Sequence, residues 1–173
     1  KRKPKTMVQF SRSCIAKCSF CCQPAFFGNV MKRSVDSIIS ELKWVKELGF
    51  NEVFINDATF TYDHEWNIEI FQRMIDENID LSWWCTTRSH CLNENILSLM
   101  KKAGCHTIGV GFESANDEVR KNIKKGLRLK NINKVVNITR KADIDILLFC
   151  VLGFYGETKE SMYETINYVK NLK

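Results

Sequence analysis

Short apolar runs alternate with longer amphipathic segments along this chain. The apolar runs are rich in β-branched and aromatic residues, which is typical of β-strands, and they span 7–10, 52–56, 81–87, 106–112 and 146–152. Between them, apolar residues recur every three or four positions, which predicts helices over 34–48, 63–77, 93–104, 116–125, 131–142 and from 158 onward. Four polar residues stand where helix N-caps are expected: Ser34, Asp63, Asn93 and Thr158.

This alternation predicts an α/β fold in which a parallel sheet of five strands is covered by helices. The run 146–152 is almost entirely apolar, so we expect a strand buried on both faces. Two cysteines in these runs, Cys85 and Cys150, are expected to be small core residues. The adjacent Trp83 and Trp84 are expected to pack in the core and against helices.

Composition limits the function classes. The chain has 173 residues, enough for one domain with a core, and no segment is long and apolar enough to span a membrane. Eight cysteines without an export signal favour a reducing, cytoplasmic environment. The net charge is +6, but the basic residues are dispersed among acidic ones. We therefore interpret them as solvated helix faces; no motif for nucleic-acid recognition supports the rival interpretation, RNA binding.

Three cysteines near the amino terminus form a C-x-x-x-C-x-x-C pattern: Cys14, Cys18 and Cys21, with Phe20 just before the last. Three thiolates in one short loop are a sulfur-rich ligand set that suits an iron–sulfur cluster. Because a cubane cluster has about four irons, three protein ligands leave one iron open to a small molecule. Cys22 adjoins Cys21 and is poorly placed to bind the same cubane.

Polar residues and glycines follow every predicted strand. Ligands bind at the carboxyl ends of strands in parallel α/β barrels and sheets, so these residues are candidates for a binding site. The second, third and fourth strands lead into Asp57, Arg88, Glu113 and Ser114, and the fifth leads into Gly153 and Gly156. Taken singly, each has an ordinary structural interpretation, such as a helix cap or a surface charge.

Several segments together resemble a known family. The cysteine loop and the segments 54–60, 85–88, 109–114 and 152–158 are similar, in order and spacing, to the radical S-adenosylmethionine (SAM) proteins. The resemblance is to their cobalamin-associated branch, which includes methyltransferases and the anaerobic magnesium-protoporphyrin ester cyclase type.

The resemblance implies a [4Fe-4S] cluster on Cys14, Cys18 and Cys21, with SAM beside it. Asp57 would stand at the position that receives the SAM amino group, and Arg88 would bind the SAM carboxylate. Glu113, followed by Ser114, would face the ribose or the amino group. The turn from Gly153 to Gly156 would border the adenine.

The implied reaction is reductive cleavage of SAM to a 5′-deoxyadenosyl radical, which abstracts hydrogen from an unknown substrate. The reductant would be a protein such as flavodoxin or ferredoxin. With cobalamin bound by another domain, the outcome would be methylation; otherwise, rearrangement or oxidation. The alternatives are an electron-transfer iron–sulfur module, a structural zinc domain that uses Cys22 as well, and a barrel fragment without activity.

The chain also departs from the family pattern. Ser13 stands where glycine is usual, and Tyr155 where proline is usual. Family barrels have six strands, and five are predicted here. We therefore expect residues 1–173 to be an incomplete radical SAM core, a partial (βα) TIM-like barrel without its sixth strand or an upstream cobalamin domain. Its exposed sheet edge would favour self-association.

Overall fold

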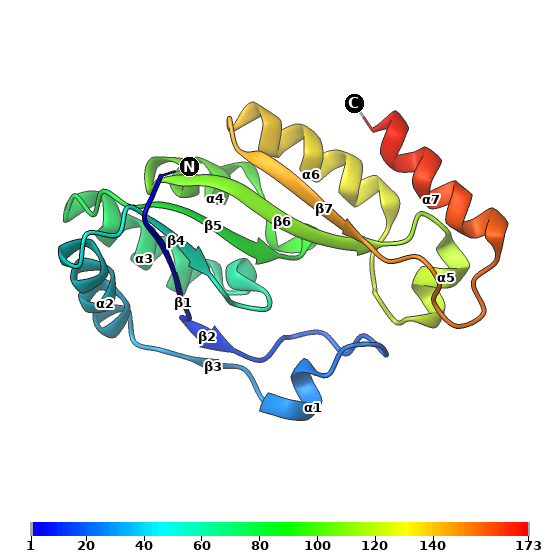
Figure 1. The fold of residues 1–173 in the computed structure, drawn as a ribbon, viewed down its shortest axis with the longest axis horizontal. Coiled ribbons are helices and arrows are strands. Elements are labelled where there is room, and N and C mark those ends of the chain that lie inside the picture. Colours follow the sequence, from blue (N-terminus) through cyan, green and yellow to red (C-terminus); the bar gives the residue numbers. More distant parts are fainter. Residues whose placement is uncertain (1, 173) are drawn as a thin grey trace.

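The structure, a computed structural model, describes residues 2–172. Five parallel strands form one sheet in the order β1-β4-β5-β6-β7, as the sequence predicts. Their bounds are Lys5–Val8 (β1), Glu52–Ile55 (β4), Ser82–Thr87 (β5), Cys105–Glu113 (β6) and Asp145–Cys150 (β7). The spatial order follows the chain order, so each strand crosses over to its immediate neighbour (Figure 1).

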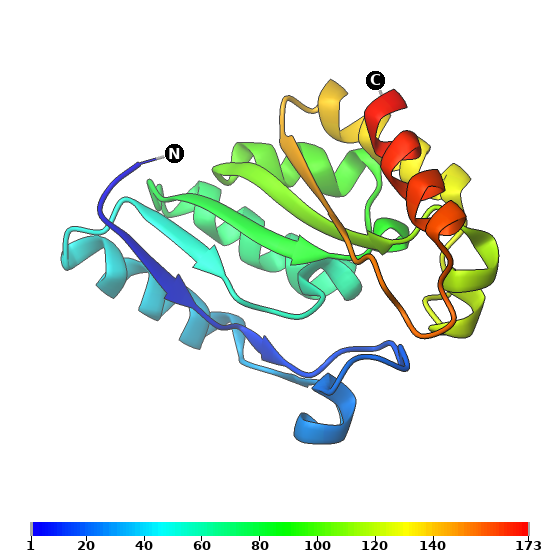
Figure 2. The same ribbon diagram turned by 45° about the vertical axis from the view of Figure 1, so that its right-hand side comes forward.

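The crossover helices lie on one side of the sheet in both ribbon views (Figures 1 and 2). They are α2 (Val35–Glu47), α3 (His64–Asp76), α4 (Glu94–Lys102) and α6 (Leu129–Lys141). The four predicted N-caps are confirmed. In each of them the side chain accepts a hydrogen bond from the backbone N–H three residues later, and they are Ser34, Asp63, Asn93 and Thr158. Two further helices, α5 (Asp117–Asn122) and α7 (Lys159–Asn171), lie near the carboxyl ends of the strands (Figure 1).

The hydrophobic core lies between the helices and the face of the sheet that they cover. Trp83 is fully buried there; its ring stacks on Phe71 at a centroid distance of 5.6 Å, and its indole N–H donates to the carbonyl of Ala103 at 2.7 Å. Satisfying the indole N–H removes the main cost of burying a tryptophan. The prediction that Trp83 is a core residue is confirmed.

Strand β7 differs from its prediction. Ile146 and Leu148 pack against the core, but Leu147 and Phe149 are 46% and 43% exposed, and Cys150 is exposed as well. The reason is that β7 is the last strand of the sheet, and helices cover only one of its faces. The prediction of a fully buried strand with Cys150 in the core is therefore wrong, whereas Cys85 is buried as predicted.

A small excursion carries the cysteine loop. The two-residue strands β2 (Ser11–Arg12) and β3 (Met31–Lys32) pair antiparallel, and helix α1 (Gln23–Phe27) lies between them in the chain. The excursion continues from the carboxyl end of β1 and lies at the bottom of the view in Figure 2. None of these three elements is among the sequence predictions, because each is too short to show a hydrophobic period.

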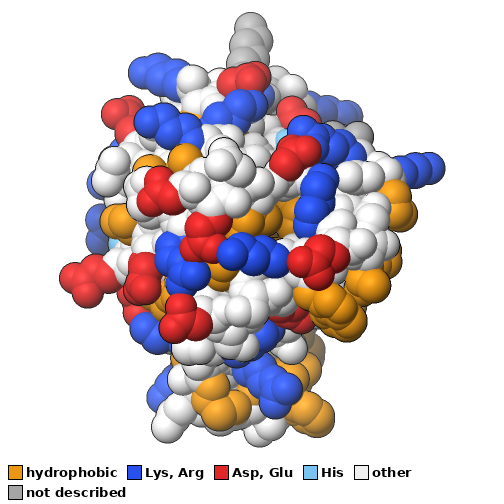
Figure 3. Space-filling view, turned by 90° about the vertical axis from the view of Figure 1, so that its left-hand side faces the viewer, with side chains coloured by type: hydrophobic (Ala, Val, Ile, Leu, Met, Phe, Trp, Pro, Cys, Tyr) orange, Lys and Arg blue, Asp and Glu red, His pale blue; other side chains and the backbone are white. Residues whose placement is uncertain are grey.

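Two further expectations concern the surface. Across residues 2–172, no helix has the length and apolar character needed to cross a membrane. Figure 3 shows the end of the molecule at which β4, β5 and β6 begin, and acidic and basic side chains are interspersed there.

Candidate functional site

A cleft of about 560 Å³ opens at the carboxyl ends of the strands, on the face without helices. All three motif cysteines line it, together with Asp57, Arg88 and Glu113 from the ends of β4, β5 and β6. Three other predicted site residues do not line it: Ser114, Gly153 and Gly156. The fold therefore brings together six of the nine candidates, from four separate strand ends.

The cysteine loop is fixed at several points. Ser13 has a φ of +73°, a left-handed conformation that glycine adopts more readily, and its hydroxyl donates to the carbonyl of Gly28 at 2.6 Å. Farther along, the backbone N–H of Cys21 donates to the carbonyl of Cys18, and that of Ser19 donates to the carbonyl of Ile123. The bond from Ser19 holds the loop against the residue that follows α5.

Polar groups point at the cysteine sulfurs. The Sγ of Cys14 lies 3.1 Å from the hydroxyl of Thr59 and accepts the N–H of Ala16 at 3.4 Å. The Sγ of Cys18 accepts from a guanidinium nitrogen of Arg88 at 3.5 Å. Donors of this kind stabilise thiolates and tune metal-bound sulfur. Cys22, in contrast, is exposed and does not line the cleft.

The donor set of the cleft suits an iron–sulfur cluster. Three thiols line one cleft, and two of their sulfurs accept hydrogen bonds from neighbouring groups. Cysteine thiolates are the usual protein ligands of such clusters, and hydrogen bonds to their sulfurs tune them. The residues present therefore fit such a group.

Asp57 is almost completely buried beneath the loop. Its carboxylate accepts the backbone N–H of Phe10 at 2.9 Å and the hydroxyl of Ser11 at 2.6 Å. Burial raises the pKa of Asp57, and these hydrogen bonds offset only part of that rise. Because both carboxylate oxygens bind the segment leading into the cysteine loop, Asp57 anchors that loop.

Glu113 forms a buried ion pair. Its carboxylate lies 2.6 Å from Nζ of Lys125, and the two side chains are 9% and 8% exposed. Glu113 has a φ of +69°, and the neighbouring Gly111 leaves the room that the pair needs, since a Cβ there would lie 2.4 Å from a Glu113 oxygen. Lys125 is a cleft residue that the sequence analysis missed, because it stands within a basic stretch interpreted as solvated surface.

Arg88 connects the other parts of the site. One terminal nitrogen reaches Cys18, and the other donates to the backbone carbonyl of Lys125. Its Nε is buried and has no hydrogen-bond partner among the described residues. A half-buried cation with a spare donor in a cleft is suited to an anionic ligand such as a carboxylate.

The remaining candidates lie beside the cleft. Ser114 is fully buried, and its hydroxyl bonds to Thr165 of α7 at 3.1 Å, on the side away from the cysteines. The turn that holds Gly153 and Gly156 is closed by Glu157, whose carboxylate accepts the N–H of Gly153 at 2.6 Å. This turn also contacts the cysteine loop, through the rings of Phe20 and Phe154 at 5.3 Å.

Comparison with known proteins defines the class. The model of the Radical SAM superfamily matches residues 8–169, so the chain belongs to that superfamily. The five parallel strands and their outer helices are the partial barrel of its core domain. Membership implies a [4Fe-4S] cluster and SAM as cofactors, and a radical SAM enzyme as the class of protein.

Two relatives show which members of the superfamily this chain is similar to. The chain is 33% identical to an uncharacterized methyltransferase of Pyrococcus horikoshii, over 98% of this chain and 37% of that protein. It is 26% identical to the anaerobic magnesium-protoporphyrin IX monomethyl ester cyclase of Synechocystis sp., over 88% of this chain and 31% of the cyclase.

Among solved structures, the radical SAM methyltransferase TsrM of Kitasatospora setae, with cobalamin and a [4Fe-4S] cluster bound, superposes with a TM-score of 0.87 at 17% identity. That match covers 96% of this chain and 34% of TsrM. The chain therefore spans about a third of the length of these relatives.

Proposed function

We propose that this chain is the part of a radical SAM enzyme that binds the cluster and SAM, with the cluster on Cys14, Cys18 and Cys21. The cluster would supply one electron to the sulfonium of SAM, which yields methionine and a 5′-deoxyadenosyl radical able to abstract hydrogen from substrate. The observation that carries the proposal is that three thiols, the half-buried cation Arg88 with its spare donor and the buried acid Glu113 line one cleft.

Different residues would bind different groups of SAM. Arg88, with Nε unsatisfied, would pair with the carboxylate of SAM. Glu113 would accept hydrogen bonds from its amino group or its ribose. Asp57 would act through the loop, because its own oxygens already hold Phe10 and Ser11.

The remaining predicted residues would act at the edge of the cleft. Ser114 would fix the backbone that follows Glu113 through its bond to Thr165. The turn at Gly153 and Gly156 would border the adenine, since it contacts the cysteine loop through Phe154.

We further propose that the whole protein transfers a methyl group with cobalamin bound outside this chain. Support comes from the methyltransferase of Pyrococcus horikoshii and from TsrM, whose structure holds cobalamin. Flavodoxin or ferredoxin would deliver the electron.

Two cysteine variants test the cluster assignment. Cys18→Ala should abolish both the binding of iron and sulfide after anaerobic reconstitution and the release of 5′-deoxyadenosine. Cys22→Ser is the matched control: it removes a thiol four positions away that does not line the cleft, and it should retain both. Iron and sulfide retained at wild-type levels by Cys18→Ala, or one zinc without sulfide in the wild type, would contradict the proposal.

A further inference from the structure

The hydroxyl of Thr59 points at a cysteine sulfur. Thr59 follows β4, is 2% exposed and lines the cysteine cleft. Its Oγ1 lies 3.1 Å from Sγ of Cys14, and the hydroxyl donates to the carbonyl of Ala58 at 2.8 Å. Thr59 stands at the N-cap position of a short 3-10 helix, Phe60–Tyr62, but its hydroxyl does not cap that helix. Helix capping, the usual use of a threonine at such a position, therefore does not explain where the hydroxyl points.

This hydroxyl has one proton and two neighbours that can accept it. While Cys14 is a thiol, its S–H can donate to Oγ1 of Thr59, and the hydroxyl proton can stay with the carbonyl of Ala58. A cysteine that holds a metal has lost its proton, so its sulfur can only accept. Because a hydroxyl rotates to suit its partners and a charged acceptor is the stronger one, the proton of Thr59 would turn toward Cys14 when a cluster is bound.

The donors to the cysteine sulfurs differ in what else they do. The backbone N–H of Ala16, which reaches Cys14 at 3.4 Å, belongs to the cysteine loop itself. Arg88, which reaches Cys18 at 3.5 Å, also binds the backbone near the cleft and is the residue proposed to pair with the carboxylate of SAM. Thr59 is therefore the donor that can be replaced without changing the loop or the proposed ligand of SAM.

A neighbouring threonine has no such contact. Thr61 is fully buried on the same segment, two residues after Thr59. Its hydroxyl bonds to the hydroxyl of Thr87 at 2.7 Å, and Thr61 does not line the cysteine cleft. Replacing Thr61 therefore removes a buried hydroxyl from the same segment without removing a donor to sulfur.

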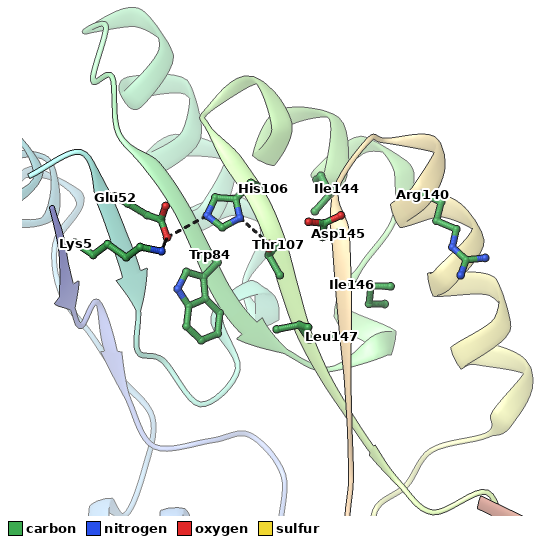
Figure 4. Close-up of a pocket in the computed structure, with 10 residues that line it drawn as sticks. All are labelled: Lys5, Glu52, Trp84, His106, Thr107, Arg140, Ile144, Asp145, Ile146 and Leu147. Atoms are coloured by element: carbon green, nitrogen blue, oxygen red, sulfur yellow. Dashed lines mark hydrogen bonds and ion pairs between the residues drawn. The ribbon is translucent and has the colours of Figure 1, made fainter. Parts of the chain in front are cut away.

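A second cavity, of about 520 Å³, lies at the amino-terminal end of the strands (Figure 4). Trp84 lines it and stacks on Phe54 at a centroid distance of 3.9 Å, so the expectation of core packing holds for Trp83 but not for Trp84. Thr107 lines it too, and its hydroxyl lies 2.6 Å from Nδ1 of His106. Thr107 is therefore a buried threonine at the end of the strands away from the cysteines.

We propose that Thr59 makes the bound cluster easier to reduce, because its hydroxyl donates to the sulfur of Cys14. Reduction adds one electron, and part of the added negative charge falls on the cysteine sulfurs. A donor to sulfur then stabilises the reduced state more than the oxidised state. The electron comes from the reductant, and the hydroxyl keeps its proton. The inference rests on the proposed function in one respect, that Cys14 holds a cluster; Thr59 acts through Cys14 and is a positioning residue.

A redox titration of the anaerobically reconstituted protein without SAM tests the proposal. The electron paramagnetic resonance signal of the reduced cluster measures the reduced fraction at each potential. Thr59→Val should lower the ratio of reduced to oxidised cluster at a fixed potential by about three- to tenfold, which is about 30–60 mV for one electron. Thr59→Ser keeps a hydroxyl and should restore most of the ratio. Thr61→Val and Thr107→Val should keep the wild-type potential.

Three results would overturn the proposal: a wild-type potential in Thr59→Val, an equal shift in Thr61→Val, or a potential in Thr59→Ser as low as in Thr59→Val. Iron and sulfide analysis shows whether each variant has taken up the cluster. Loss of the cluster in Thr59→Val but not in Thr61→Val would overturn it as well, because Thr59 would then serve assembly of the cluster rather than its potential.

The proposed function can fail separately. A cluster whose potential depends on Thr59 but that ignores SAM would remove only the SAM chemistry. A cluster that responds to SAM and has the same potential in Thr59→Val would remove only the role of Thr59. A wild-type protein that takes up no iron and sulfide would remove both.

Discussion

The Nζ atom of Lys125 lies 2.6 Å from the carboxylate of Glu113, and both side chains are almost fully buried at the wall of the cysteine cleft. Removing one partner of a buried ion pair leaves an uncompensated charge, which typically costs about 3–5 kcal/mol. Replacing both residues costs much less, because no unpaired charge is then left buried. The pair is therefore a strong constraint on where Glu113 can point.

This pair gives the first prediction. Glu113→Gln and Lys125→Met should each lower the free energy of unfolding by about 3 kcal/mol, and the double variant should recover most of that loss. Urea denaturation of the four proteins measures the coupling. The pair of Arg73 and Glu77 at the carboxyl end of α3 is the control; its side chains are 34% and 26% exposed, so its coupling should be much weaker. Equal coupling in the two cycles would contradict the burial argument.

Arg88 provides the second prediction. Arg88→Met should weaken the binding of SAM to the reconstituted protein by about tenfold or more, since a charge-assisted hydrogen bond contributes about 1.5–3 kcal/mol. Equilibrium dialysis measures the affinity. Arg73→Met removes a guanidinium on α3, outside the cleft, and should leave the affinity unchanged. Wild-type affinity in Arg88→Met would show that another group binds the carboxylate.

The third prediction tests whether Ser114 supports the fold or contacts the cofactor directly. Ser114→Ala should lower the free energy of unfolding by about 1–3 kcal/mol, because the hydroxyl of Thr165 and the N–H of Asn116 lose a buried partner. The affinity for SAM should change little. Ser40→Ala, at an exposed position of α2, should change stability by less than about 0.5 kcal/mol. A large loss of SAM affinity with unchanged stability would reverse the assignment.

From the pKa of Glu52 we predict that the free energy of unfolding depends on pH. Burial alone would raise its pKa, but hydrogen bonds from Lys5 and the Arg2 backbone, with nearby His106, outweigh burial and leave the pKa below the ordinary value of 4.5. In the acidic range below 4.5 the unfolded chain then binds more protons than the folded protein, so stability falls as the pH falls through the folded pKa.

Urea denaturation between neutral pH and about pH 3 tests whether the free energy of unfolding falls as the pH falls. In Glu52→Gln the part of the slope due to this group should vanish, so the stability difference from the wild type should shrink as the pH falls. Glu47→Gln, at an exposed position of α2, should keep the wild-type slope. An unchanged acid slope in Glu52→Gln would show that other groups cause it.

The elements that the sequence predicts are those fixed by local patterns. Helices α2, α3 and α4 have a hydrophobic period and an N-cap within their own residues, so they need no information from elsewhere. The cysteine motif and the polar residues after the strands could also be found, because parallel strands bring their carboxyl ends together.

The features that the sequence analysis missed depend on distant contacts. The composition of β7 does not reveal that it lies at the edge of the sheet. Alternation places Trp83 and Trp84 on opposite faces, but only the packing of α3 shows which one is buried. Lys125 has the local pattern of a surface lysine, and its buried partner Glu113 stands twelve residues earlier in the chain.

The central claim is an iron–sulfur cluster with one iron open to SAM. Electron paramagnetic resonance of the anaerobically reconstituted and reduced protein, recorded with and without SAM, tests it most directly. We predict a signal from the reduced cluster that shifts when SAM is added. A cluster signal that is indifferent to SAM would contradict this account and favour an electron-transfer module.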